Sequence, residues 1–533
     1  MYRIDSRLQE LLIDPFGFLG PKRKKLLETG WSGLFRKSLL EEVPVDTIKA
    51  CFSGITGRPT KELRMVSGVM ILQHMFDLTD QETVSHLAFN IQWHYILDLT
   101  TEDDSTKYIC ERTLRNYRRK MQDLHLEDIL FRVLTDKLLK AFNVPTQKQR
   151  LDSTHIHSDM KRLRRLNLFQ ETIRLFLREF EKKEPGQFIS LLPDELIKRY
   201  QKQTSGYFGQ VKPSEAKEKL DQAARDLFLL VETCKDQEPI RQWKSYKLLQ
   251  RLMSDQCIVV GQGEDPKIEM IEPKEVASNA LQNPSDPDAG YSGHKGQGYQ
   301  AQLMETFQEE DAGSGEEAGK KAIPNLVTYV DVEPANCSDS DAPARAIAET
   351  KERGCCPKEL LADTAYGSDE NVQKAKEEDV ELIAPTMGKP KSKEEKLILD
   401  DCNFNGETGE MESCYMNKPP LQMRQTESGK WIVTFADEIC QQCEAKEYCS
   451  IGQAKDHTLE YTAKQRRLAE RRVQEESEEF REKYRYRSGI EGLNAKLKRK
   501  LKLGRLRVRG LARVRFAVIL KVLSWNILQA AKA

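Results

Sequence analysis

The sequence predicts a mixed α/β core with two insertions, preceded by an all-helical domain. Apolar residues recur at helical spacing in roughly the first 145 residues. Strand-like segments begin near Gln149, and helix-like segments separate several of the later ones. A chain of 533 residues is too long for one ordinary hydrophobic core, so we expect two or three domains.

Residues 1–145 are predicted to form the all-helical domain. Thr79 and Glu82 have the spacing of a capping box, which marks the start of a helix. A short basic helix follows in CERTLRNYRRKMQDL. Helix, turn, helix and basic helix is the arrangement of many DNA-reading domains, although ordinary helical bundles also show it. On the first interpretation, DNA is contacted by Arg115, Arg118 and Arg119.

The rest of the chain, 146–533, is predicted to hold the α/β core. Its first strand-like segment is QRLDSTHIHSDM, which contains Asp152. A helix is expected at 338–354, with Ser338 or Asp339 as its cap. Strand, strand, strand, helix, strand, helix, strand is the order of an RNase H-like core. The later strands are expected at 298–306, 325–333, 359–367 and 380–386.

Two segments interrupt this pattern and are predicted to be insertions. Residues 161–270 are helical in character and rich in charge. Residues from about 395 to 460 contain glycine, asparagine and cysteine around one short strand, WIVTF. Helices are expected again from about Tyr461 to the end of the chain.

Charge is distributed unevenly, although the net charge is zero. Residues 481–533 contain 16 Lys plus Arg and two Glu, a local charge of +14. Such a segment can neutralise several phosphates, although a solvated helix face would look the same. The apolar run 516–531 is interrupted by Lys521 and Asn526, so a membrane span is not expected.

The N-terminus and the cysteine content indicate a reducing compartment. MYRIDSRLQE has no apolar signal core, which predicts a cytoplasmic protein. Twelve cysteines in so long a chain do not make a disulfide framework, so they are expected to be thiols or metal ligands.

Three acidic residues are the candidate catalytic groups. Asp152 lies in the first strand, and Asp363 follows the apolar run ELLA, so it should lie at the end of a strand. Glu491 lies in a helix, KYRYRSGIEGLNAKLKRK. Taken singly, each acid is also explained as a turn or surface residue. Together, three converging carboxylates would suit hard divalent cations. A site that cuts DNA needs about two such ions.

The helix of Glu491 presents two different faces. Tyr484, Arg487, Glu491 and Lys498 fall within a stripe only about 60° wide, at about 100° per residue. Ile490, Leu493 and Leu497 form a separate apolar stripe that should face the core. A helix salt bridge would also place a carboxylate beside Arg and Lys. We favour a metal-binding acid flanked by phosphate-binding cations.

YRYRSGIEGLNAKLKRK resembles the Tyr-x2-Arg-x3-Glu-x6-Lys signature of the DDE transposases of many bacterial insertion sequences. LDSTHIH and LADTAYGS look like the matching Asp-containing blocks, and GRPTKELRMVSGVMILQHMFDLTDQETVSHLAFN is similar to the helical domain that opens these proteins. The similarity covers most of the chain except the two insertions.

This resemblance implies DNA transposition, in which the enzyme cleaves transposon ends and joins them to target DNA. Asp152, Asp363 and Glu491 would bind two Mg²⁺ or Mn²⁺, while Tyr484, Arg487 and Lys498 would hold the transposon end. The partner would be double-stranded DNA, with at least a homodimer in the active complex. A bacterial, nucleoid-associated cytoplasmic protein is expected.

A cysteine cluster indicates a possible structural zinc site. Cys440, Cys443 and Cys449 form C-x2-C-x5-C, and C-x2-C is a usual zinc half-site. Cys402 is the expected fourth ligand, with Cys414 and His457 as substitutes. Free thiols remain the alternative, and similar clusters in related transposases favour zinc.

Two other functions stay open at this point. An RNase H-like nuclease would cut DNA without joining it. A non-catalytic DNA-binding derivative would have no need to keep all three acids.

Overall fold

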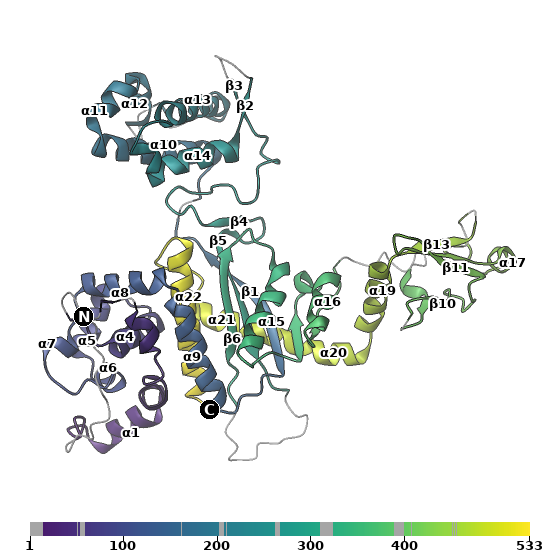
Figure 1. Ribbon diagram of the computed structural model, residues 1–533, viewed down its shortest axis with the longest axis horizontal. Helices are drawn as coiled ribbons and strands as arrows, with labels where there is room; N and C mark the ends of the chain where they lie inside the picture. The colour runs from purple at the N-terminus through teal and green to yellow at the C-terminus, as the bar shows by residue number, and fades with distance from the viewer. Residues whose placement is uncertain are drawn as a thin grey trace.

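The computed structural model describes residues 14–50, 52–53, 59–160, 162–201, 207–208, 211–261, 267–309, 323–387, 399–406, 408–449, 451, 454 and 456–533. A central sheet is flanked by N-terminal helices on one side and by a small β body on the other (Figure 1). A second helical body lies beyond one end of the sheet (Figure 1). The chain is therefore mixed α/β with a helical N-terminal region, as predicted.

The N-terminal region packs around one apolar helix, α4 (Leu63–Met75), most of whose residues are buried. Thr79 and Glu82 form the predicted capping box at the start of the following helix. The other elements here are α1 (Pro21–Thr29), α2 (Trp31–Leu34), the π-helical turn η1 (Phe35–Leu39), α3 (Val45–Lys49), α5 (Asp80–Phe89), α6 (Ile91–Ile96), α7 (Asp104–Lys107), α8 (Glu111–Asp123) and α9 (Leu126–Ala141).

The central sheet has the strand order β6–β5–β1–β7–β8, and the short β4 extends the β6 edge of β5. β1 runs antiparallel to β5 and parallel to β7, which is parallel to β8. Helices α15 (Ala342–Glu352) and α16 (Asp369–Glu377) separate β6, β7 and β8. The predicted order of strands and helices is therefore found. The strands are β1 (Lys148–His157), β4 (Gly290–Ser292), β5 (Gly296–Thr306), β6 (Val327–Pro334), β7 (Glu359–Ala362) and β8 (Glu381–Ile383).

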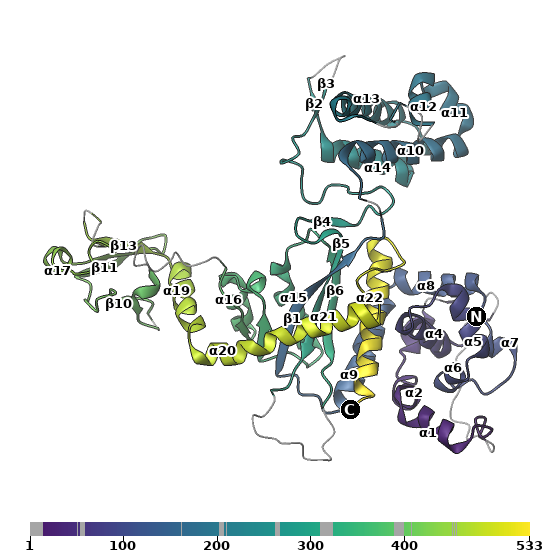
Figure 2. The ribbon, with the colours of Figure 1, turned by 180° about the vertical axis from the view of Figure 1, so that it is seen from behind.

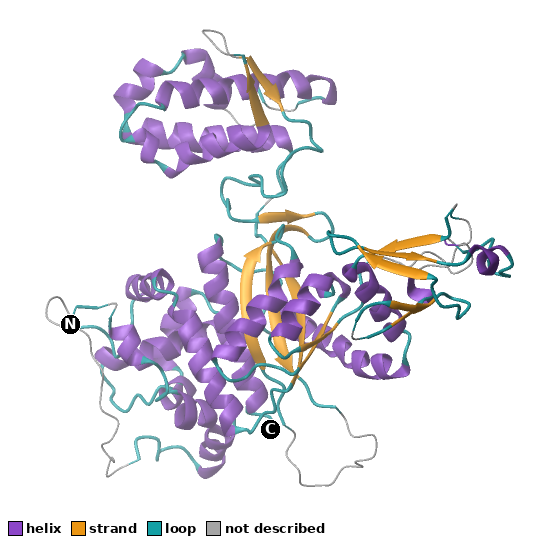
Figure 3. Ribbon diagram, turned by 45° about the vertical axis from the view of Figure 1, so that its right-hand side comes forward, coloured by secondary structure: helices purple, strands orange, loops and turns teal. Residues whose placement is uncertain are grey.

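Helices cover both faces of this sheet (Figure 3). Leu151 of β1 packs into the core shared with α15 and α16. Ile156 packs into the other core, which includes Ile490, Leu493 and Leu497. Because successive side chains of a strand point to opposite faces, Asp152 faces the same side as Ile156. Figure 2 shows α21 (Gly489–Lys500), which carries Glu491, crossing the sheet on that side.

The C-terminal helices complete the core. α19 (Ala463–Glu475) and α20 (Glu478–Tyr484) lead through a 3-10 turn, η7 (Arg485–Ser488), into α21. The last helix, α22 (Leu511–Ala530), is largely buried.

Both polar residues that interrupt the apolar run of α22 have partners. Lys521 Nζ donates to Asp77 Oδ1 at 2.8 Å, and Asn526 Nδ2 donates to the Val327 carbonyl at 2.8 Å. In the described part of the chain, no helix has the length and apolar character that a membrane crossing requires.

The segments predicted as insertions each have a hydrophobic core of their own. The helical body contains α10 (Arg165–Lys183), α11 (Pro185–Leu191), α12 (Asp194–Gln201), α13 (Ala216–Cys234), α14 (Lys244–Gln256), β2 (Cys257–Val260) and β3 (Lys267–Met270). The small β body contains β9 (Asn403–Phe404), β10 (Met411–Ser413), β11 (Gln422–Gln425), β12 (Trp431–Thr434), α17 (Asp437–Gln441) and β13 (Thr458–Tyr461).

Candidate active site

Asp152, Asp363 and Glu491 gather around the guanidinium of Arg487. Arg487 Nη2 lies 3.4 Å from Asp152 Oδ1 and 3.3 Å from Asp363 Oδ2. Its Nη1 donates to Glu491 Oε1 at 2.7 Å. Asp152 comes from the central strand, Asp363 from the residue after β7, and Glu491 from the first turn of α21. The fold thus brings together three carboxylates from segments far apart in the chain.

A buried ion pair holds the turn that carries Arg487. Arg150 Nη2 lies 2.7 Å from Glu305 Oε2, and both side chains are buried between β1 and β5. Arg150 Nη1 also donates to the Tyr486 carbonyl in η7 at 3.0 Å. A Cβ at Gly489 would clash with Arg150 Nη1, so a larger residue there would force the Arg150 guanidinium to move. Gly489 therefore leaves room for Arg150 to reach the turn that carries Arg487.

The predicted stripe of Tyr484, Arg487, Glu491 and Lys498 spans three elements instead of one helix. Tyr484 ends α20, Arg487 lies in the 3-10 turn, and the other two lie in α21. The charge of Asp152 acts on the pKa of both Tyr484 and Lys498, so the two ends of the stripe lie near the same carboxylate. The change of helix type does not separate these four residues.

Burial gives the three carboxylates different characters. Burial raises the pKa of Asp152 to about 6, against the opposing effect of the Arg487 charge. The side chains of Asp363 and Glu491 are 48% and 64% exposed. One carboxylate therefore stands at the floor of the site, and two stand at its open side.

Two residues of the site were missed by sequence reasoning. Asn494 Nδ2 donates to Asp152 Oδ2 at 3.1 Å, while its own Oδ1 is buried and has no hydrogen-bond partner among the described residues. Lys295 Nζ donates to Ser153 Oγ at 3.1 Å, and its charge lowers the pKa of Asp152. Asn494 follows Glu491 by three residues, so the helical period places both side chains on one face and could have identified Asn494 as a site residue. Lys295 lies in the turn between β4 and β5, where no regular spacing in the sequence indicates which side chains face the site.

The histidines beside Asp152 differ in exposure. His155 is 6% exposed, and neither ring nitrogen has a partner in the described structure. Burial, together with the neighbouring His157, lowers the pKa of His155 to about 4, so the ring is neutral at pH 7. His157 is exposed, and its ring centroid lies 4.6 Å from that of His155. His294 lies in the exposed turn beside Lys295.

The donor set suits hard divalent cations, because three carboxylates converge and two of them reach solvent. Each of the three carboxylates contacts the Arg487 guanidinium. Among described residues, the one group of histidine, cysteine and acidic side chains whose candidate ligand atoms all lie within 4.8 Å is elsewhere, at His125, Glu127 and Asp128. The guanidinium thus occupies the space between the carboxylates, where a cation would be bound.

Several cysteines of the small β body lie around one cavity, although no three of the described sulfurs all lie within 4.8 Å of one another. Cys414, Cys440, Cys443 and Cys449 line a cavity of about 20 Å³. Burial raises the pKa of Cys440 to about 11 and that of Cys402 to about 12, and neighbouring cysteines add to both shifts. Cys402 packs beside this group without lining the cavity, whereas His457 Nδ1 contacts the Ile451 carbonyl at 3.1 Å. Cys414 lines the cavity, while Cys402 lies close enough to Cys414 and Cys449 for them to raise its pKa, so Cys402 as the fourth ligand stays a prediction.

The three arginines of α8 lie in different surroundings. Arg118 donates to Asp80 and, at 2.8 Å, to Gln73 Oε1, so it is engaged within the N-terminal region. Arg115 is 59% exposed and lies 3.7 Å from Glu111. Arg119 is exposed. Arg115 and Arg119 are therefore the more accessible of the three.

Comparison with protein families gives two matches. Residues 413–531 match a family model described as a transposase DDE domain, and residues 35–120 match one described as a transposase domain. The first range includes Glu491 but neither aspartate, and the second includes the arginines of α8. Neither the curated proteins nor the solved structures gave a match. The DDE-domain match implies an RNase H-like fold and dependence on a divalent metal, and the two matches together point to a DDE transposase acting in DNA transposition.

Proposed function

We propose that this protein cleaves transposon ends and joins them to target DNA at Asp152, Asp363 and Glu491. The observation that carries the proposal is the convergence of these three carboxylates on Arg487. When bound, two Mg²⁺ or Mn²⁺ ions would activate the attacking oxygen and stabilise the leaving oxygen. The positions of the three residues on rigid elements support this role, because displacement at phosphorus depends on positioning.

The side chains around the carboxylates would hold the DNA backbone. Arg487 can bind a phosphate through two parallel hydrogen bonds, and we expect it to exchange its carboxylate partners for a phosphate when the ions bind. Lys498 and Lys295 add positive charge beside Asp152. Tyr484 stacks on Phe480, with ring centroids 5.4 Å apart, and lies beside Arg487. Asn494 orients Asp152 through its amide.

The small β body would bind one structural zinc ion. The four cysteines lining its cavity provide the soft, fourfold donor set that zinc prefers. Zinc there would stabilise the segment between β8 and α19 and would take no part in the reaction.

A strand-transfer assay tests the proposal. The substrate is labelled duplex DNA carrying the sequence that flanks the reading frame, incubated with a supercoiled target plasmid and Mg²⁺. We expect nicked ends and joined products from the wild type and neither from Asp152→Ala. The same two products from Asp152→Ala would contradict the assigned site.

The same assay separates transposition from simple hydrolysis. Nicked ends without any joined product would favour the nuclease alternative. Tight DNA binding with no cleavage in Mg²⁺ or Mn²⁺ would favour the non-catalytic derivative. Two transposon ends must be held together for transposition, so joined products should require at least a dimer.

A further inference from the structure

The segment that follows the catalytic helix is basic along one side. Residues 501–510 alternate in exposure: Leu501, Leu503 and Leu506 are buried. The exposed residues between and beyond them are Lys502, Arg505, Arg507 and Arg509. The apolar side chains fix the segment to the core, and the cationic side chains face solvent.

Main-chain contacts hold this segment in place. His157 N–H donates to the Gly504 carbonyl at 2.9 Å, which joins the segment to β1. Gly510 N–H donates to Asp286 Oδ1 at 2.9 Å, and Lys521 Nζ donates to the Leu501 carbonyl at 2.6 Å. The segment is therefore a fixed surface that begins where α21 ends.

This surface leads into a groove of about 460 Å³ between the α4–α5 corner, α8, the segment and α22. His74 adds no charge, because burial lowers its pKa to about 3. Two carboxylates line the groove, those of Asp77 and Asp80. Six cationic side chains line it: Arg115, Arg118, Arg119, Arg507, Arg513 and Lys521.

The two carboxylates neutralise only part of the positive charge of the six cations. Asp80 pairs with Arg118 and lies 3.9 Å from Arg115. Asp77 pairs with Lys521 at 2.8 Å and with Arg507 at 3.3 Å. Three arginines form no salt bridge with any residue that the structure describes: Arg119 and Arg513 of the groove, and Arg509 of the adjoining segment. The groove therefore has a surplus of positive charge, which favours a polyanion.

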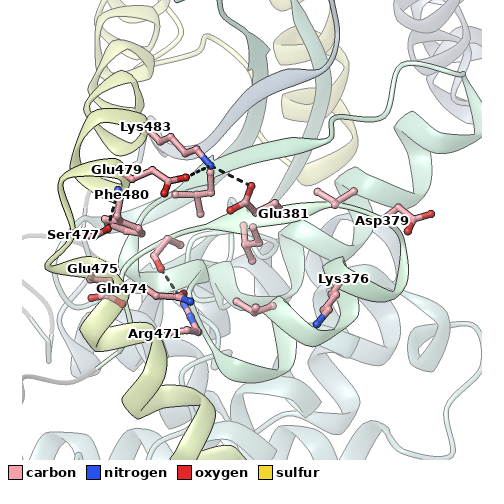
Figure 4. A pocket seen from close by; sticks show the side chains of 15 residues that line it. Lys376, Asp379, Glu381, Arg471, Gln474, Glu475, Ser477, Glu479, Phe480 and Lys483 are labelled. Carbon is pink, nitrogen blue, oxygen red and sulfur yellow. Dashed lines mark hydrogen bonds and ion pairs between the residues drawn. The ribbon is translucent and has the colours of Figure 1, made fainter. Parts of the chain in front are cut away.

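A larger cavity elsewhere shows that volume alone does not create such a site. It measures about 540 Å³ and lies between β8, α16, α19 and α20 (Figure 4). Lys483 pairs there with Glu479 and Glu381, and Arg471 Nη2 donates to the Ala384 carbonyl at 2.9 Å (Figure 4). Four acids and three bases line it, so it offers no comparable attraction for phosphates.

We propose that the segment and the groove bind one backbone strand of duplex DNA and lead it from Glu491 to the N-terminal helices. This inference rests on the proposed function, since it requires DNA at the carboxylates. The DNA-binding surface would then be composite: Arg115, Arg119 and Arg513 line the groove, and Arg509 belongs to the segment that joins the groove to α21. Because these cations meet phosphates, the contact should be independent of base sequence.

The test is a salt titration of DNA binding with a mixed-sequence duplex of about 30 base pairs. The variant is Arg509→Ala combined with Arg513→Ala. The matched control is Lys198→Ala combined with Arg225→Ala, two exposed cations of the helical body. Each lost phosphate contact should reduce the slope of log affinity against log salt by about 0.9, so we expect a change of about 2. The affinity should fall about tenfold or more at moderate salt.

Cleavage kinetics provide a second readout. The variant should raise KM for transposon-end DNA and leave kcat within about twofold, because neither arginine touches the carboxylates. A slope and a KM equal to those of the control would overturn the inference, while the loss of cleavage in Asp152→Ala would leave the proposed function intact. A wild-type protein that neither binds nor cleaves DNA would overturn both.

Discussion

The three carboxylates and the cysteines differ in how the chain gathers them. Asp152, Asp363 and Glu491 come from one strand of the central sheet, the end of another and a helix that crosses the sheet. The cysteines lie within one short stretch and have only a small apolar core around them. The first group is held by the whole fold, whereas the second has little to hold it besides its own contacts. We therefore expect metal at the carboxylates to affect the reaction, and metal at the cysteines to affect stability.

The strongest test of this contrast removes metal from the small β body. Structural zinc contributes on the order of 10 kcal/mol in small domains, so Cys443→Ser should lose the ion and expose residues 399–461 to protease. Cys414→Ser should behave in the same way and Cys402→Ser should not, because Cys402 does not line the cavity.

Zinc content by mass spectrometry and limited proteolysis measure this effect. Cys110→Ser is the control, because Cys110 is exposed in the N-terminal region. If both Cys414→Ser and Cys443→Ser retained zinc, these cysteines would not be zinc ligands and the prediction would be wrong.

The second test concerns the carboxylates. Glu491→Gln should lower the cleavage rate by about 10²–10³-fold or more without changing the melting temperature, since the side chain is 64% exposed. Glu482→Gln removes an exposed charge from the same run of helices and should retain activity. Equal rates for the two variants would show that Glu491 is a surface residue.

A buried carboxylate outside both regions shows the effect of burial on a single acid. Glu127 is 1% exposed, and burial raises its pKa to about 7. The folded state therefore holds the proton more tightly than the unfolded chain, and the free energy of unfolding falls as pH rises from about 4.5 through 7.

Substituting Glu127 should remove this dependence. Above pH 7 the penalty is about 3 kcal/mol, so Glu127→Gln should melt at a higher temperature than the wild type at pH 8 and at a similar one at pH 5. Thermal melts at the two pH values measure the difference. The prediction would be wrong if the wild-type melting temperature rose from pH 5 to pH 8 and the substitution had no effect on it.

The smallest expected effect is that of Asn494, which donates to Asp152. Removing such an orienting group costs about 10–100-fold in metal affinity or activity, so Asn494→Ala should raise the Mn²⁺ concentration needed for half-maximal cleavage about tenfold. The matched control is Asn116→Ala, the same substitution on the exposed side of α8. An unchanged metal requirement would exclude the positioning role.

The sequence predicted those parts of the fold that have a local signal. The strands and the capping box at Thr79 follow from periodicity and spacing. The spacing also grouped Tyr484, Arg487, Glu491 and Lys498, but it predicted one helix where the structure has three elements. The position of Arg487 between all three carboxylates does not, because it depends on the path from α20 to α21. The contact of Lys295 with Ser153 could not be predicted either, because Lys295 lies in a turn whose sequence has no regular spacing.

The ammonium of Lys521 has a mechanical consequence. In the middle of α22 it joins Asp77 of the N-terminal region to the carbonyl of Leu501, the residue that follows α21. The N-terminal region and the helix of Glu491 therefore share one buried ammonium as a hydrogen-bond donor. If the proposed function holds, DNA bound by the N-terminal helices and the carboxylate of Glu491 are therefore linked through contacts that include this ammonium.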